Sequence, residues 1–414
     1  MLKHIKEFKK EIKKEKVSES MKKKLLFVID SLTIGGAEKS LISLLSMIDS
    51  SKYEIDLLLF KKGEDLEKYV PKYVNMLSVP EYFRFINKEK LPISKKIPYF
   101  YYRFKTSLSL RLNNYKENAL HSEQVVFRSL KKIISPLPKK YDVAIAYSQG
   151  MPTYFVANKV TALRKLAWIN TDYVNTLYDK ETDYESYKKM HKIIAVSQHV
   201  KESVSRIRKE YNSKVDIILD MIDPNIIYKM AEEHVVNEFH NSSINILTVG
   251  RLVNVKSYDT AIEVTRLLKN SGYKFKWFGV GDGPERKRLQ LLIDKYELNG
   301  YFILLGKKLN PYTYMKNCDI YVQTSITEGF GLTVSEAKIL KRPIVCTSFP
   351  TANEIINHNI DGLIVNHDIN SIYNGIKRYL DDISFKEKIM KELDSIEPYN
   401  SVNQLKKFYE LVEK

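Results

Sequence analysis

Two carboxylates in the second half of the chain flank a glycine turn. Glu328 and Glu336 stand on either side of the sequence Gly-Phe-Gly-Leu-Thr-Val-Ser. On one helix this spacing would set the two side chains about 80° apart, so a shared helical face explains it poorly. A turn that holds Glu328 after the strand 319–323, followed by a helix that holds Glu336, explains it better. The glycines would let the backbone approach a ligand, and the helix N-terminus suits a phosphate.

A structural role is the alternative for the same stretch. Thr333 and Glu336 have the spacing of a capping box, in which the glutamate binds the backbone at the start of a helix. Two glutamates at this spacing are a weak signal on their own, so the pattern leaves both interpretations open.

A pair of cations provides a second candidate site. Gly250 ends the apolar segment 244–249, and Arg251 and Lys256 follow it. A strand that delivers a glycine and then two cations could clamp a diphosphate. The alternative is that both cations are solvated on the surface.

The surroundings of the two glutamates resemble the C-terminal domain of glycosyltransferase family 4. The segments that carry the resemblance are 325–336, 343–347 and 353–365, and the order of Gly250, Arg251 and Lys256 is similar to the Gly-Arg-Leu…Lys pattern of that family. The resemblance is loose over residues 22–410 and close over residues 244–365. It implies retaining transfer of a sugar from a nucleotide donor by a protein of the GT-B fold.

The resemblance also implies a role for each candidate residue. Glu328 would contact the sugar hydroxyls, Glu336 the ribose, and the backbone after Gly306 the nucleobase. The implied catalytic residues are Glu328, Arg251, Lys256 and Asn170. The implied donor-binding residues are Gly35, Gly36, Gly250, Gly306, Lys307, Gly329, Phe330, Gly331, Leu332, Thr333 and Glu336.

One departure from the family pattern concerns Asn170. The stretch from Trp168 to Asp172 resembles the family's Trp-Ile-His-x-Asp sequence, whose histidine lies close to the sugar. An amide donates a hydrogen bond but does not titrate near neutral pH. Asn170 could therefore replace a histidine that makes a polar contact, but not one that transfers a proton.

Neither a metal nor a cofactor is expected. A nucleoside diphosphate leaving group gains negative charge in the transition state. Many transferases neutralise this charge with a metal held by Asp-x-Asp, and that triplet is absent from the sequence. Arg251, Lys256 and the helix N-terminus after Gly331 could neutralise it instead.

The nucleotide sugar, which we expect to be a UDP-sugar, is then a substrate. Front-face displacement assisted by the leaving phosphate is the expected route to retention.

Apolar segments bounded by glycine and polar residues predict alternating strands and helices. The segment 25–29, followed by Gly35 and Gly36 and an apolar helical face, predicts the first unit of a doubly wound domain, although a tight turn without a ligand is the alternative. Further strands are expected at 54–60, 76–79, 142–146, 164–172, 192–197, 214–219, 244–250, 302–306 and 319–323, with a strand and turn at 275–284 and a helix from Pro284. We predict an α/β protein of the GT-B fold, with two Rossmann-like domains facing a central cleft.

A chain of 414 residues is too long for one ordinary domain. The expected parts are a basic N-terminal extension at 1–20, an acceptor domain at 21–235, a donor domain at 236–397 and a final helix at 398–414 that crosses back to the N-terminal domain. The extension is either an amphipathic helix or a frayed tail. Asp223 to Asn225 resembles the family's hinge, and a polar linker is expected from there to Ser243.

The net charge of +17 is concentrated in two stretches. Residues 1–24 hold ten Lys and four Glu, and residues 81–140 hold fourteen basic, four acidic and ten aromatic residues. Basic and aromatic side chains on helices suit an anionic lipid surface. The alternative is a solvated helical insertion into the N-terminal domain whose aromatic residues form a core. Nucleic acid is not an expected partner, because no known nucleic-acid-binding module occurs.

The cysteine content and the hydropathy of the sequence indicate the cellular compartment in which the protein is expected. Cys318 and Cys346 make no disulfide framework, and both fall in or beside predicted buried strands, which indicates inert thiols in a reducing compartment. No apolar run has the length needed to span a bilayer. We expect a cytoplasmic protein that is peripheral at the inner face of the cell membrane.

Three functions were compared with these observations. We expect transfer of a sugar to a lipid-linked or polysaccharide acceptor in the synthesis of a capsule, exopolysaccharide or teichoic-acid type of glycan. The alternative, suggested by Asn170, is a catalytically weak partner subunit of a glycosyltransferase complex. A phosphorylase or epimerase of the same fold fits poorly, because the glutamates and cations together follow the transferase pattern.

Overall fold

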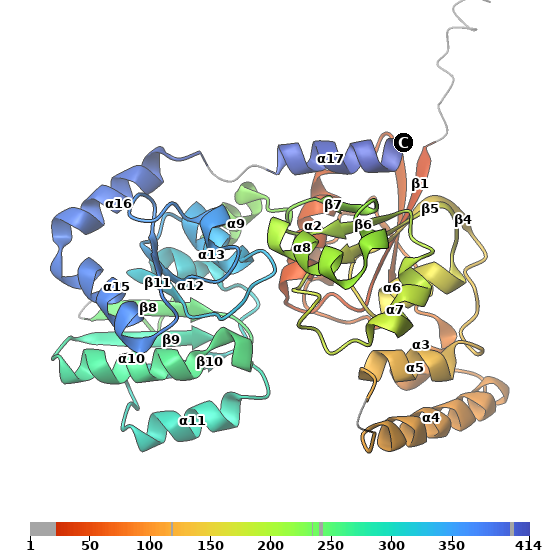
Figure 1. Ribbon diagram of the computed structural model, residues 1–414, viewed down its shortest axis with the longest axis horizontal. Coiled ribbons are helices and arrows are strands. Elements are labelled where there is room, and N and C mark those ends of the chain that lie inside the picture. The colour runs from red at the N-terminus through yellow and green to blue at the C-terminus, as the bar shows by residue number, and fades with distance from the viewer. Residues whose placement is uncertain (1–21, 117–118, 234, 240–242, 398–400) are drawn as a thin grey trace, which may run out of the picture. The chain divides into compact units, whose positions relative to one another are not determined.

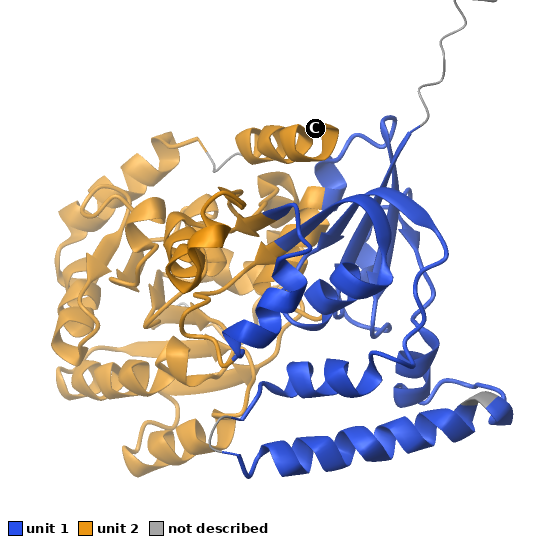
Figure 2. Cartoon of the chain, turned by 45° about the vertical axis from the view of Figure 1, so that its right-hand side comes forward, with its two compact units in different colours: residues 1–32, 45–167, 178–192 blue, residues 33–44, 168–177, 193–414 orange. Residues whose placement is uncertain are grey.

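The computed structural model describes residues 22–116, 119–233, 235–239, 243–397 and 401–414. The expected extension at 1–20 lies outside these residues. The chain divides into two compact units, shown in blue and orange in Figure 2. Unit 1 comprises the described residues of 1–32, 45–167 and 178–192, and unit 2 those of 33–44, 168–177 and 193–414. The domain boundaries expected from the sequence stay a prediction.

The first half of the chain alternates strands and helices as expected. The strands are β1 (Lys23–Ile29), β2 (Tyr53–Leu59), β3 (Asn75–Met76), β4 (Lys140–Ala146), β5 (Thr161–Ile169), β6 (Lys192–Ala195) and β7 (Val215–Ile217). The helices are α2 (Gly36–Met47), α3 (Glu81–Ile86), α4 (Ile93–Asn113), α5 (Ser122–Leu130), α6 (Met151–Lys159), α7 (Lys180–Tyr187), α8 (Gln198–Ile207) and α9 (Pro224–Ala231). The strand order is β3-β2-β1-β4-β5-β6-β7, and β1 runs parallel to both β2 and β4.

The second half repeats the pattern around another parallel sheet (Figure 1, green to blue). Its strands are β8 (Ile244–Val249), β9 (Phe275–Val280), β10 (Phe302–Gly306), β11 (Ile320–Gln323), β12 (Ile344–Thr347) and β13 (Leu363–Val365). Its helices are α10 (Tyr258–Asn270), α11 (Arg286–Lys295), α12 (Tyr312–Asn317), α13 (Leu332–Ile339), α14 (Ala352–Ile355), α15 (Ile369–Asp381), α16 (Ile383–Ser395) and α17 (Val402–Glu413). The two parallel sheets with alternating helices confirm the predicted α/β class.

The order of the second sheet determines where a ligand can bind. The order is β10-β9-β8-β11-β12-β13, so the chain changes direction between β8 and β11. In open parallel sheets, ligands bind beyond the carboxyl ends of the strands at this switch point. Arg251 and Lys256 follow β8, and Glu328 follows β11. The topology therefore brings together candidates that lie about seventy residues apart in sequence.

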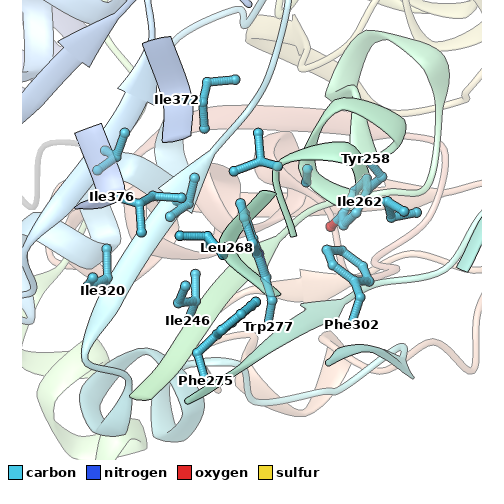
Figure 3. Packing of buried hydrophobic residues seen from close by; sticks show 14 of the residues in the cluster. Ile246, Tyr258, Ile262, Leu268, Phe275, Trp277, Phe302, Ile320, Ile372 and Ile376 are labelled. Atoms are coloured by element: carbon cyan, nitrogen blue, oxygen red, sulfur yellow. The ribbon is translucent and has the colours of Figure 1, made fainter. Parts of the chain in front are cut away.

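A buried cluster holds the second sheet to its helices. Figure 3 shows Trp277 of β9 among Ile246, Leu268 and Phe302, and all four side chains are fully or almost fully buried. The indole Nε1–H of Trp277 donates to Thr248 Oγ1 at 3.0 Å, which satisfies its polar group inside the apolar cluster.

Burial raises the pKa of the thiols of Cys318 and Cys346 to about 12, as expected for inert cysteines.

Two expectations about local structure are wrong. The linker expected between Asp223 and Ser243 contains α9, because Asp223 caps the backbone N–H of Asn225 at 3.0 Å and Pro224 has the backbone angle of a first helical residue. The helix expected from Pro284 begins at Arg286. The backbone N–H of Glu285 donates to Leu252 O at 3.1 Å, so a turn precedes this helix.

The last helix and the serine before it contact other residues of unit 2. Ser401 Oγ accepts from the backbone N–H of Ile222 at 2.8 Å, and Gln404 Oε1 accepts from that of Leu219 at 3.1 Å. The rings of Phe408 and Trp168 lie 6.5 Å apart. The helix thus contacts residues that the sequence assigns to the N-terminal domain, although residues 398–400 lie outside the described residues.

The basic and aromatic insertion consists of three helices in unit 1. α4 has 21 residues and packs against α3 and α5. One face of α4 is buried through Tyr99, Thr106 and Asn113. The hydroxyl of Tyr99 donates to Glu81 Oε2 at 3.0 Å, and burial together with this carboxylate raises the pKa of Tyr99 to about 12. Part of the insertion is therefore core, as the solvated-insertion alternative requires.

Candidate active site

Lys256 and Glu328 form an ion pair at the switch point of the second sheet. Lys256 Nζ lies 2.6 Å from both Oε1 and Oε2 of Glu328. Glu328 Oε1 also accepts from Ser325 Oγ at 2.7 Å and from Gln323 Nε2 at 3.1 Å. The side chains of Lys256 and Glu328 are 17% and 10% exposed. This acid is thus held in place by one cation and two neutral donors.

The turn after Glu328 ends in a helix N-terminus, as expected. Gly331 has φ +96°, a left-handed conformation that glycine adopts readily, and α13 begins at the next residue. A Cβ atom on Gly331 would lie 2.6 Å from Ile355 Cδ1, so this position also requires a small residue. The free N–H groups of the first turn of α13 could bind a phosphate.

Glu336 does not form the capping box that was the structural alternative. Its Oε1 accepts from Lys39 Nζ at 2.9 Å and from the hydroxyl of Tyr312 at 2.8 Å, and its Oε2 lies 3.2 Å from Lys39 Nζ. The Glu336 side chain is only 3% exposed. A buried carboxylate needs such partners, and here they come from helices α2 and α12.

Gly35 and Gly36, at the start of α2, form a glycine loop. This loop lies against residues 328–332, here called the donor turn, within unit 2. A Cβ atom on Gly36 would lie 3.0 Å from Leu332 Cδ1, and one on Gly35 would lie 2.2 Å from Glu38 Oε2. Gly329 approaches Asn170 as closely, because a Cβ atom there would lie 2.1 Å from the Asn170 carbonyl oxygen. The structure thus gathers Gly35, Gly36 and Asn170 around the same turn.

The remaining candidates differ in their surroundings. Arg251 is exposed, in contrast to Lys256. Phe330 is buried, and Thr333 Oγ1 donates to Gln323 Oε1 at 3.4 Å. Gly306 ends β10, two strands away from β8, and its nearest side chain is Arg286. Gly306 and the neighbouring Lys307 therefore lie apart from the ion pair.

A hydrogen-bonded group around Asp172 was not expected from the sequence. Asp172 Oδ1 accepts from Ser203 Oγ at 2.6 Å, and Oδ2 lies 3.2 Å from His199 Nε2. Burial alone would raise the pKa of Asp172, but hydrogen bonds from Ser203, Asn175 and His199 lower it. The only sequence signal was the polar end of β5, because His199 follows 27 residues later on α8.

Two acids with raised pKa values lie near the glycine loop. Burial raises the pKa of Glu38, while its own backbone N–H and the charge of Arg251 oppose the rise. Burial raises the pKa of Asp220 to about 7; its hydrogen bond with Ser40 lowers it, and the charge of Glu38 raises it further. Asp220 is thus an acid that titrates near neutral pH.

Asp220 should make the stability of the fold depend on pH. Its folded pKa lies above the ordinary value of 3.8, so between about pH 4 and 7 the native state holds a proton that the unfolded chain releases. The free energy of unfolding therefore falls as the pH rises through this window. We expect Asp220→Asn to remove this part of the slope and to raise stability at pH 8 by at most about 4 kcal/mol. Denaturant unfolding of both proteins from pH 4 to 8 measures the difference, and parallel curves would contradict it.

Among the described residues, no group of three or more His, Cys, Asp or Glu side chains is placed to hold a metal ion. Arg251 and Lys256 are positively charged residues that follow β8 at the switch point.

Comparison with known proteins identifies the family. Residues 229–393 match the family model "Glycosyl transferases group 1". A Campylobacter jejuni protein named N-acetylgalactosamine-N,N'-diacetylbacillosaminyl-diphospho-undecaprenol 4-alpha-N-acetylgalactosaminyltransferase is 27% identical over 365 residues, which are 87% of this chain and 90% of that protein. Residues 229–393 thus form a group 1 glycosyltransferase domain.

Other relatives match over shorter stretches or by fold. The Staphylococcus aureus poly(ribitol-phosphate) alpha-N-acetylglucosaminyltransferase is 29% identical over 167 residues, 39% of this chain and 34% of that protein. Anabaena HepE, solved with UDP and glucose, superposes with a TM-score of 0.68 at 16% identity and covers 94% of this chain and 99% of its own. TarM of S. aureus gives a TM-score of 0.66 at 18% identity, covering 95% and 100%. These likenesses confirm the GT-B fold of this glycosyltransferase.

Proposed function

We propose that this glycosyltransferase moves a sugar from a UDP-sugar to a lipid-linked or polysaccharide acceptor, with retention at the anomeric carbon as in glycosyltransferase family 4. The observation that carries the proposal is the Lys256–Glu328 pair beside the N-terminus of α13. Glu328 would bind sugar hydroxyls, and the helix N-terminus would face the diphosphate. A binding site for both parts of a nucleotide sugar therefore lies at the switch point.

The leaving group would be stabilised by positive charge from the protein. Lys256 and Arg251 could each donate charge-assisted hydrogen bonds to the departing diphosphate, together with the free N–H groups of α13. The exposed side chain of Arg251 suits this role, since it can turn to a ligand. We propose that these groups act without a metal.

The acceptor class is proposed from the relatives. The Campylobacter protein is named for a diphospho-undecaprenol acceptor and the Staphylococcus protein for poly(ribitol-phosphate). Both are large glycans or glycolipids that carry phosphate. We therefore propose an acceptor of the cell-surface glycan type, such as a capsule, exopolysaccharide or teichoic-acid intermediate.

The function is tested first by donor binding and then by turnover. A thermal-shift screen with UDP-, GDP- and ADP-sugars should show stabilisation by a UDP-sugar, because a ligand that binds only the native state raises its stability. The purified protein should then release UDP from that donor when a lipid-linked acceptor is added. Donor binding without turnover on any acceptor would favour the alternative of a catalytically weak partner subunit, which Asn170 suggests.

We also propose that α4 binds an anionic membrane surface at the inner face of the cell membrane. Seven apolar side chains of this helix are exposed: Ile93, Ile97, Phe100, Tyr101, Phe104, Leu108 and Leu112. At 100° per residue they fall within an arc of about 120°. Arg103 lies to one side of the arc and Lys105 to the other, and Arg111 lies within the arc in the last turn of α4. Apolar and basic side chains together on one helix suit a bilayer interface. No helix among the described residues has the length and apolar character to cross a membrane.

Replacing two of these aromatic residues should weaken membrane binding. We expect Phe100→Ser with Phe104→Ser to lower the affinity for anionic vesicles about tenfold or more, because both rings would insert among the acyl chains. The double variant Arg103→Gln, Lys105→Gln should have a similar effect at low salt and less at high salt. Vesicle flotation measures both effects.

The matched control for this experiment is Leu291→Ser. Leu291 is an exposed apolar residue of α11 and is 69% exposed, like Phe104. Its replacement should leave flotation unchanged. If the full-length protein did not bind anionic vesicles at low salt, α4 would have no role at a membrane.

A further inference from the structure

A cation that the candidate donor site does not account for lies against Glu336. Lys39 is the fourth residue of α2 and follows the loop of Gly35 and Gly36 by one helical turn. Its Nζ lies 2.9 and 3.2 Å from the two oxygens of Glu336 and 4.6 Å from the ring centre of Tyr312. The Lys39 side chain is 16% exposed. Lys39 thus forms an ion pair with Glu336 at a position that is largely shielded from water.

The arrangement leaves the acid able to bind one more donor. A carboxylate has about four acceptor positions. Lys39 and Tyr312 take two on Oε1, and Lys39 takes one on Oε2. The free position on Oε2 could accept a hydroxyl hydrogen bond. Without Lys39, the buried carboxylate would lose a cationic partner and its fixed orientation.

We propose that Lys39 is a positioning residue for the nucleoside: it holds the Glu336 carboxylate in the orientation in which the acid binds a ribose hydroxyl of the donor. This inference rests on the proposed function, in which Glu336 binds the ribose. Because Lys39 lies on the helix that follows the glycine loop, ribose binding and the position of that loop are linked through one side chain. The loop at Gly36 also touches Leu332 of the donor turn.

The experiment compares two nucleotides that differ only in the ribose. Calorimetric titration with UDP and with 2′,3′-dideoxy-UDP gives, for each protein, the ratio of the two affinities. The wild type should prefer UDP by about tenfold or more, the contribution of a hydrogen bond to a charged group. Lys39→Met should lose most of this preference while binding dideoxy-UDP nearly as well as the wild type does.

Two further variants make the outcome specific. Glu336→Gln should lose the same preference, and Lys274→Met, a change at an exposed lysine far along the sequence, should keep it. A structural role alone would weaken the binding of both nucleotides equally in Lys39→Met, and that result overturns the inference. So does an unchanged preference in Lys39→Met when Glu336→Gln has lost it. If the wild type binds no UDP, the proposed function fails and this inference with it.

Discussion

Glu328→Gln should lower sugar transfer about a hundredfold while leaving the fold intact. Glutamine has the size of glutamate and could still accept from Lys256, Ser325 and Gln323, the three partners of Glu328. It cannot supply the negative charge that makes a hydrogen bond to a sugar hydroxyl strong, and such bonds are worth about 1.5–3 kcal/mol. The measurement is kcat/KM for UDP release with donor and acceptor at several concentrations.

The control for this prediction is a glutamate outside the site. Glu387 of α16 is exposed, and Glu387→Gln should keep full activity. Thermal unfolding should give similar Tm values for both variants. Normal turnover by Glu328→Gln would show that the sugar binds elsewhere.

Lys256→Met should lower sugar transfer more than Glu328→Gln does, because Lys256 has two proposed roles: it binds the leaving diphosphate and it pairs with Glu328. The leaving diphosphate would lose one of its proposed charge donors, which typically costs about a hundred- to a thousandfold in rate. Glu328, only 10% exposed, would also be left with neutral donors alone. We therefore expect a loss of stability of about 1–3 kcal/mol together with the loss of activity. Denaturant unfolding and initial rates measure the two effects separately.

The double variant Lys256→Met with Glu328→Gln distinguishes these two tasks. Removing the unpaired charge should restore much of the lost stability, since the two residues are coupled. It should not restore activity, because neither the acid nor the cation is present. Lys287→Met on α11 is the matched control, as Lys287 is exposed. Recovery of turnover in the double variant would assign Lys256 to holding Glu328 in place rather than to the leaving group.

Most of the α/β pattern was predictable because it depends on local sequence. Short apolar segments ended by glycine or polar residues predicted the strands from β1 to β11 to within a few residues. The two errors, at α9 and at the start of α11, arose where a short helix or turn depends on one hydrogen bond. Asp223 and Glu285 make those bonds, and the second one reaches a residue more than thirty positions away.

The candidate site was predictable as a set of residues but not as a set of contacts. The sequence indicated Glu328, Lys256 and the turn at Gly331, because glycine and charge after a strand are local signals. It did not indicate that Lys256 would pair with Glu328 at 2.6 Å. That contact exists because the sheet order places β8 beside β11, and strand order depends on long-range packing.

For Glu336 too, the sequence predicted the residue and its local structure but not its contacts. By itself, the sequence predicted that this acid lies inside a helix after a glycine turn, and the pattern left a capping box and a ligand contact as alternatives. Only the tertiary structure decided between a local cap and a distant partner, by bringing Lys39 from almost three hundred residues away. The physical reason is that a buried carboxylate takes whichever donors the packed elements supply, and the sequence alone does not give those neighbours.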